Sequence, residues 1–296
     1  MAANFICWLY RYAIVSSGSE ASKVLTGVTS VLVNFKIIWH RTKYISELIN
    51  GFIRLRPPVR KQKRPWSVYH NQLLYKLIFL PNESDFFTVS LCTMTLLAYG
   101  ALLRPSEFAK RQHCAVLNRK QIKFHPSHKH PTEIILSLYS SKTNKLNIEE
   151  RLIIPCVCKS KLANTWCPCP VHMIKYYVSL RDKLFKKNGP LFVNNKGARK
   201  GSPISYYTFN KFLKSAITIF NSKLNLNLNP SHYTPHVIRV GSTTDLVRHG
   251  YSPHFIQRRG RWLSQIWRHI YINLIWEDIS LISKLSISQL LLQIPK

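Results

Sequence analysis

The segment from Arg56 to Trp66, RPPVRKQKRPW, constrains more than any other how this chain can fold. Its three prolines lack backbone N–H donors and exclude a regular helix: Pro57, Pro58 and Pro65. Its positive charge lies on Arg56, Arg60, Lys61, Lys63 and Arg64. Such a stretch is typical of a domain boundary. We therefore expect a helical domain over 1–58, a basic Pro-rich linker over 59–66 and a larger domain over 67–296.

The charge of the whole chain indicates its partner. The sequence has 43 Lys and Arg against 12 Asp and Glu, a formal net charge of +31. Repulsion among so many like charges destabilises the compact state unless a polyanion is usually bound. We therefore expect double-stranded nucleic acid as the partner, and the five linker cations suit a strap across its phosphate backbone. A solvated linker and a surface kept basic for solubility are the alternative interpretation.

Other classes of protein are disfavoured. No run of about 18 to 20 uncharged apolar residues is present, so we expect no membrane association. The apolar N-terminal stretch has no basic run before it, which argues against a cleaved signal peptide. Seven cysteines are an odd number for a disulfide framework and predict thiols in a reducing, intracellular compartment.

Four of those cysteines lie within one short stretch: Cys156, Cys158, Cys167 and Cys169. Four thiolates could hold a tetrahedral zinc ion. Each pair has only one intervening residue, which strains chelation, so buried or loop thiols are the other interpretation.

The hydrophobic periodicity predicts a mainly α chain with a small antiparallel β-sheet (α+β). Helices are expected over 4–15, 20–42, 44–55, 67–80, 85–102, 104–110, 171–187, 206–220, 235–249, 253–260 and 264–274. The strands expected between them are 115–118 with 121–124, 133–140 and 151–155. A last apolar helix over 279–294 needs a cover, either from its own domain or from a neighbouring protomer.

Six residues, in order along the chain, form a set suited to metal-free transfer of a DNA phosphate onto a tyrosine: Arg104, Lys142, His236, Arg239, Trp262 and Tyr271. A phenol with a pKa near 10 needs cations and a base to become a nucleophile. The two arginines would neutralise the pentavalent phosphorus, the lysine would protonate the leaving oxygen, and the indole N–H would donate to a phosphate oxygen. We expect no metal or other cofactor in this chemistry.

Five stretches resemble the tyrosine recombinase (phage integrase) family: YGALLRPSEFAK, SSKTNKLNIEERLIIP, CPVHMIKYYVSLR, TPHVIRVGSTTDLVRHGYSPHFIQRRGRW and HIYI. The resemblance covers roughly residues 44 to 276. The CPV, SKT and GRW motifs are most similar to eukaryotic crypton and DIRS-type mobile-element recombinases or viral ones. The resemblance implies the same six catalytic residues, a brace for the Arg104 loop at Glu107, and recombination or integration through a 3′-phosphotyrosyl intermediate.

The resemblance also implies an architecture. A catalytic domain would follow a SAM-like core-binding domain, which here is shorter than usual and looks truncated. The enzyme would act as a homotetramer on two DNA sites, joined through the helix over 279–294, in the nucleus if its host is eukaryotic or it is carried by a virus. Two alternatives stay open: a catalytically silent, domesticated DNA-binding protein and a relaxing enzyme like type IB topoisomerases.

Overall fold

A computed structural model describes Cys7, Arg11 and residues 18–35, 43–55, 64–111, 115–139, 148–158, 168–265 and 267–268. The chain divides into two compact units, Met1–Gln62 and Lys63–Lys296. The boundary falls inside the basic segment that the prolines mark. The expected helix over 4–15, apart from Cys7 and Arg11, lies outside the described residues, as do most of the linker and the final helix over 279–294.

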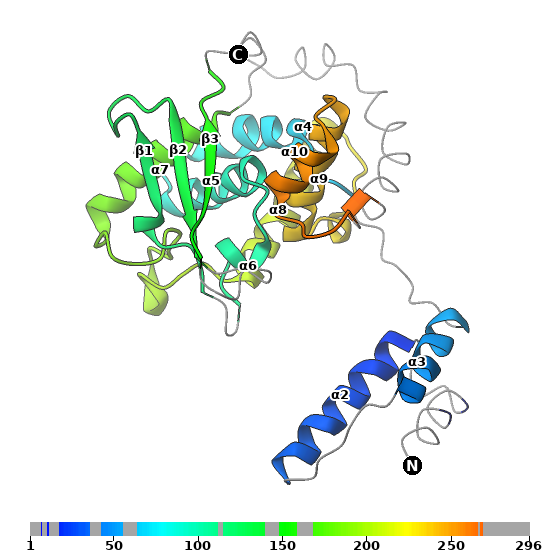
Figure 1. Cartoon of the computed structure of the whole chain (residues 1–296). Coiled ribbons are helices and arrows are strands. Elements are labelled where there is room, and N and C mark those ends of the chain that lie inside the picture. Colours follow the sequence, from blue (N-terminus) through cyan, green and yellow to red (C-terminus); the bar gives the residue numbers. More distant parts are fainter. Residues whose placement is uncertain are drawn as a thin grey trace. The chain divides into compact units, whose positions relative to one another are not determined.

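In the described part of the first unit, α2 (Gly18–Asn34) and α3 (Lys43–Leu55) pack against each other (Figure 1). Ala21 and Leu25 are buried on α2, and Ile45 and Ile49 are buried on α3. Each pair is spaced i, i+4, so each helix presents one apolar stripe. The helix expected over 44–55 is confirmed. The helix expected over 20–42 is confirmed as far as Asn34.

The second unit is built mainly of helices. They are α4 (Val68–Leu73), a π-helical segment (Leu74–Phe79), α5 (Phe86–Gly100), α6 (Pro105–Phe108), α7 (Pro170–Leu184), α8 (Tyr206–Leu224), α9 (Pro235–Arg248) and α10 (Pro253–Gly260). Short 3₁₀ turns lie at Leu80–Asn82, Arg119–Gln121, Gly197–Arg199 and Pro230–His232. The expected helix over 67–80 is therefore α-helical only in its first half.

Three antiparallel strands form the sheet, in the order β1 (Ile122–His125), β2 (Glu133–Leu138) and β3 (Glu150–Pro155). In the register, Ile122 faces Leu136, and Leu136 faces Leu152. The predicted sheet is confirmed, but the expected strand over 115–118 is wrong. Leu117 does hydrogen-bond through its backbone, with Glu107 and Leu191 rather than with a strand of the sheet.

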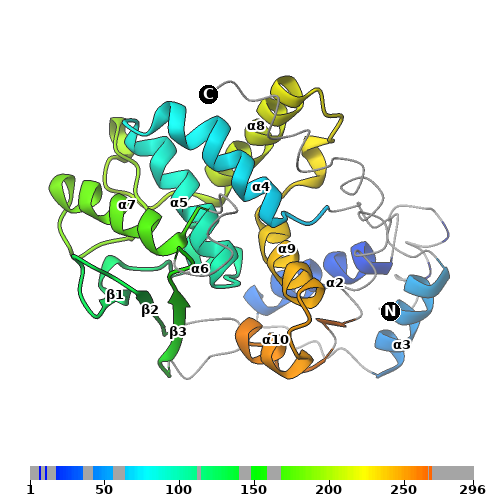
Figure 2. The ribbon, with the colours of Figure 1, turned by 90° about the horizontal axis from the view of Figure 1, so that it is seen from above.

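The core is centred on α5, an apolar helix that is buried on nearly all sides. It packs on α7, which lies beside the sheet, and on α9, which lies with α8 and α10 (Figure 2). A helix that is apolar all round is expected in the interior of a domain. Because α5 ends at Gly100, the turn that carries Arg104 begins between the sheet and α9.

The exit of the linker is fixed on α9. The backbone N–H of Trp66 donates to the carbonyl of Val237, 3.0 Å away, and the Trp66 indole donates to Asn71. A Cβ placed on Gly241 would lie 1.9 Å from the Trp66 carbonyl oxygen, so only glycine allows this approach. Trp66 is therefore anchored on α9 at two positions that each lie two residues from Arg239.

No helix in the described part of the chain combines the length and apolar character needed to span a bilayer.

Candidate active site

Arg104 lies in the tight turn between α5 and α6. Pro105 occupies the first helical position of α6, and the Glu107 carboxylate accepts a hydrogen bond of 2.7 Å from the Arg104 backbone N–H. The same carboxylate forms an ion pair of 3.3 Å with the Arg104 guanidinium. Glu107 is buried. The prediction that Glu107 braces the Arg104 loop therefore agrees with these contacts.

Arg239 is the fifth residue of α9 and is only 1% exposed. Its guanidinium donates to the carbonyl oxygens of Leu102 and Gly260. Leu102 has a φ of +47°, a left-handed conformation that turns the chain directly before Arg104. Arg239 thus holds together the turn after α5 and the end of α10.

Both arginines converge on the C-terminal end of α10. Arg104 donates to the carbonyl of Arg261 over 3.0 Å, while Arg239 donates to the adjacent carbonyl of Gly260. The guanidinium of Arg239 also lies over the ring of Trp262, with Cζ 4.4 Å from the ring centre. The structure therefore brings three of the six predicted residues into one cluster from three separate segments of the chain.

Trp262 is held on both sides. Its ring stacks on Trp267, with centres 5.4 Å apart. A Cβ on Gly260 would lie 1.7 Å from the Trp262 ring, so the ring packs against the bare α-carbon. Its backbone N–H donates to Gln257. These contacts fix the ring where it covers Arg239.

Two further arginines, which the sequence analysis missed, belong to this cluster. Arg261, whose side chain is 6% exposed, donates to Glu107 over 2.7 Å and lies 3.8 Å from Glu150. Arg259 donates to the carbonyls of Ile153 and Gly100. Burial lowers the pKa of both guanidinium groups, and the positive charge of a neighbouring arginine lowers each pKa further. The stretch RRGRW carries the signal, because three arginines flank the glycine that begins the Trp262 loop.

His236 is the second residue of α9, three before Arg239, and is half-buried. Residues spaced i, i+3 share a helix face. The predicted HxxR pair therefore lies on one helix, at its N-terminal end.

Lys142 and Tyr271 lie outside the described residues, but the chain on either side of Lys142 is described. Leu138 of β2 and Glu150 of β3 are paired, so the segment with Lys142 is the link between two neighbouring strands. The Glu150 carboxylate contacts Arg261. One end of the predicted lysine turn is thus attached to the arginine cluster.

The segment before Tyr271 is described as far as Arg268. Trp267, which stacks on Trp262, is buried and precedes Tyr271 by four residues. The described chain is therefore still in contact with the arginine cluster four residues before the predicted nucleophile. Among the predicted linker cations, Arg64 is half-buried, and Arg56, Arg60, Lys61 and Lys63 lie outside the described residues.

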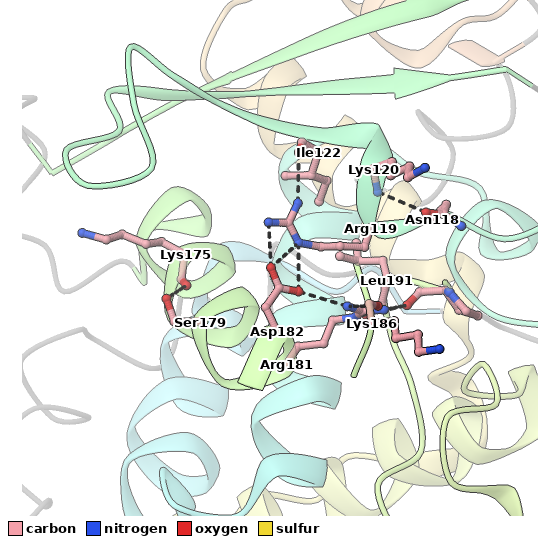
Figure 3. Close-up of polar contacts among 11 residues, drawn as sticks. Asn118, Arg119, Lys120, Ile122, Lys175, Ser179, Arg181, Asp182, Lys186 and Leu191 are labelled. Carbon is pink, nitrogen blue, oxygen red and sulfur yellow. Dashed lines mark hydrogen bonds and ion pairs between the residues drawn. The ribbon is translucent and has the colours of Figure 1, made fainter. Parts of the chain in front are cut away.

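Buried arginine alone does not define the site, as a second network shows (Figure 3). Arg181 is 1% exposed and donates to the carbonyls of Lys186, Pro190 and Leu191, and it pairs with Asp182. Asp182 also pairs with Arg119, which fixes α7 to the turn before β1. A hollow of about 330 Å³ opens beside this pair. The charged groups of this second network bond mostly to one another and to backbone carbonyls, which indicates a structural role.

Three of the four predicted cysteines lie in a compact cluster that also contains a histidine. Cys156, Cys158 and Cys169 converge with His172, and Cys167 lies outside the described residues. Burial, reinforced by Cys169 and Cys156, raises the pKa of the Cys158 thiol to about 12. His172 was not predicted, because the sequence analysis paired only the cysteines.

Comparison with known proteins gives a family match for part of the chain. Residues 160–275 match the sequence model of the phage integrase family. No curated protein matches the chain in sequence.

Solved structures give a broader match. The Tn1549 transposon integrase in complex with transposon right end DNA has a TM-score of 0.55 and 12% identity, over 95% of this chain and 84% of that one. The same integrase in complex with circular intermediate DNA has a TM-score of 0.52 and 12% identity, and the match covers 100% of this chain and 84% of that one. The XerA recombinase, at 17% identity over 86% and 80%, has a TM-score of 0.48, too low to bear on the fold. The chain is mostly helical with a small three-stranded antiparallel sheet, and its fold is that of tyrosine recombinase catalytic domains.

Proposed function

We propose that this protein breaks and rejoins DNA by site-specific recombination, with Tyr271 as the nucleophile. The observation that supports the proposal best is the convergence of Arg104 and Arg239 on adjacent carbonyls beside Trp262. Preorganised guanidiniums stabilise charge as it develops on a transferring phosphoryl group. The net charge of +31 and the family match over 160–275 point to the same substrate, a DNA backbone.

In the proposed step, the Tyr271 phenolic oxygen attacks the phosphorus of a backbone phosphodiester. An O–P bond forms to the 3′ phosphoryl group, and the bond from phosphorus to the 5′ oxygen breaks. His236 takes the phenolic proton, and Lys142 gives a proton to the leaving 5′ oxygen. A 5′ hydroxyl from a partner strand then reverses the step and rejoins the DNA.

Arg104 and Arg239 would bind the non-bridging oxygens throughout, and the Trp262 indole N–H would donate to one of them. The Glu107 carboxylate would hold the guanidiniums of Arg104 and Arg261 in position through its ion pairs with both. The chemistry would use protein side chains only, since an arginine cluster supplies the positive charge that a metal ion supplies elsewhere.

Several wider features belong to the same proposal. The enzyme would bind two DNA sites as a homotetramer, joined through the segment 279–294, and the linker cations would cross the phosphate backbone. It would act in the nucleus of a eukaryotic host, as a recombinase of the crypton or DIRS type, of a mobile element or a virus. The motifs CPV, SKT and GRW support this subgroup.

The test is covalent trapping on a nicked suicide duplex, which prevents religation. The wild-type chain should form an adduct that survives denaturing electrophoresis, and peptide mapping should find the DNA on Tyr271. Tyr271→Phe should form none. Tyr251→Phe, which changes a 49% exposed tyrosine of the same unit, is the matched control and should form the adduct normally.

Other outcomes would decide against recombination. Adduct formation by Tyr271→Phe would exclude the assigned nucleophile. Tight DNA binding without any adduct would favour the silent DNA-binding alternative. Relaxation of supercoiled DNA by a monomer, with no requirement for a target sequence, would favour a topoisomerase-like activity.

A further inference from the structure

A cluster of soft ligands lies where β3 leads into α7. Cys156 directly follows β3, Cys158 lies two residues later, and Cys169 and His172 begin α7. Their ligand atoms all lie within 4.8 Å of one another. All three cysteines are free thiols.

The local backbone explains why these four side chains meet. Cys156 and Cys158 are spaced i, i+2, and in an extended chain such residues point to the same side. Cys169 is the N-cap of α7, and His172 is the third residue of that helix, the position whose side chain reaches back to the N-cap. Two local pairs therefore face each other, without the strain of chelation by Cys167 and Cys169.

The distances suit a tetrahedral zinc ion. Zn–S bonds of about 2.3 Å place two sulfurs of such a site about 3.8 Å apart. The Cys156 and Cys169 sulfurs are 3.7 Å apart, and the Cys158 sulfur is 3.1 Å from Nδ1 of His172. The widest separation in the cluster, 4.8 Å, needs a shift of about 1 Å, which small side-chain rotations provide.

We propose that Cys156, Cys158, Cys169 and His172 bind one structural zinc ion that joins the end of β3 to the start of α7. Three thiolates and one imidazole close all four positions, as in structural rather than catalytic zinc sites. The ion would close the chain segment 159–168 into a loop. It would also fix β3, whose Ile153 carbonyl accepts a hydrogen bond from Arg259 of the arginine cluster.

The experiment uses the untagged full chain, with zinc and cobalt(II) as the probes. The protein purified under reducing conditions should contain about one zinc per chain by elemental analysis. Cobalt(II) should replace the zinc and give the d–d absorption of a tetrahedral site with thiolate charge-transfer bands. Chelation of the metal should lower the Tm by at least about 5 °C, because binding free energy is folding free energy.

Single variants test the ligand set. Cys158→Ser and His172→Ala should each weaken metal binding by at least about 100-fold, more than loss of an outer-shell contact costs. His172→Cys should restore binding and add the charge-transfer absorption of a fourth thiolate. Two matched controls should bind as the wild type does: Cys167→Ser, from the same stretch, and Cys7→Ser, an exposed thiol elsewhere.

Three results would overturn the assignment. The first is the absence of bound metal in the wild-type chain, with a Cys156–Cys169 disulfide in its place. The second is metal content in Cys158→Ser equal to that of the wild type. The third is a loss in Cys167→Ser as large as that in His172→Ala, which would indicate a ligand set of cysteines alone. None of these readouts depends on cleavage of DNA, so the zinc site and the proposed function fail separately.

Discussion

The guanidinium carbon of Arg239 lies 4.4 Å from the centre of the Trp262 ring. The ring is stacked on Trp267 behind, and Arg239 donates to the carbonyl of Gly260, directly before the Trp262 loop. Trp262 therefore has two separable properties: an aromatic face that keeps Arg239 in place, and an indole N–H that could donate to a phosphate oxygen. Variants can remove one property while keeping the other.

We predict that Trp262→Phe and Trp262→His have opposite defects. Phe keeps the stack and the face over Arg239 but lacks the N–H, so adduct formation should slow by about 100-fold with little change in Tm. His keeps an N–H donor but packs less area, so the rate should fall less while stability falls by about 1 kcal/mol. Single-turnover trapping and thermal unfolding measure the two effects. Equal rates for both variants would contradict a role for the N–H.

Glu107→Gln should destabilise the second unit by about 3 kcal/mol, because the buried Arg261 guanidinium loses its closest counter-charge. Binding to short DNA at low salt should not weaken, since the substitution makes the cluster more positive. Chemical denaturation and a fluorescence titration with DNA measure these quantities. Glu47→Gln, whose side chain is 62% exposed beside Lys43, is the control and should leave stability unchanged. Full stability of Glu107→Gln would show that Arg261 does not depend on this carboxylate.

Gly241→Ala should destabilise the protein by about 2 kcal/mol, although alanine is the better helix former. The added Cβ would meet the Trp66 carbonyl at 1.9 Å and push α9 away from the linker exit. Gly100→Ala is a matched control at the end of α5, where a Cβ would lie 3.5 Å from Pro170 in ordinary contact. Its Tm should stay close to that of the wild type. An unchanged Tm for Gly241→Ala would mean that Trp66 moves without cost.

His70 should make stability depend on pH below neutrality. Burial lowers its pKa from 6.5 to about 4, and its ring nitrogen accepts a hydrogen bond from the Ser67 backbone N–H. As the pH falls, His70 is protonated in the unfolded chain before it is protonated in the folded one. The stability that neutral His70 contributes is therefore fully present above pH 6.5 and is lost as the pH falls towards 4. The loss amounts to about 3 kcal/mol. The free energy of unfolding, measured by denaturation at pH values from 7.5 to 4.5, should depend less on pH in His70→Asn than in the wild type. The same pH dependence in both proteins would contradict the prediction.

The sequence predicted the sheet and the second-unit helices because their patterns are local. It failed where partners are distant or the backbone is unusual. Leu117 has the apolar alternation of a strand, but its backbone bonds to Glu107 and Leu191, which no local pattern could reveal. The π-helical turn over Leu74–Phe79 has the composition of an α-helix.

The candidate site was predictable in its residue types and only partly in its geometry. Arg104 and Arg239 donate to adjacent carbonyls in a site where Leu102 and Arg261 both adopt positive φ, a conformation that their side chains do not signal. Glu107 serves two arginines, and only the one three residues away was visible in the sequence. His172 joins the thiol cluster because α7 begins at Pro170 and turns its third residue back towards Cys169.

The contact between Trp66 and Gly241 has a practical consequence for building chimeric proteins. Trp66 is fixed to the helix that carries His236 and Arg239. Its backbone N–H donates to the carbonyl of Val237, and its backbone packs against Gly241. A foreign N-terminal module should therefore be spliced upstream of Arg64, within residues 56–63, so that this anchor travels with the second unit. A junction placed after Trp66 would remove the side chain and backbone that pack against α9. It would thereby disturb the position of Arg239 in any hybrid protein.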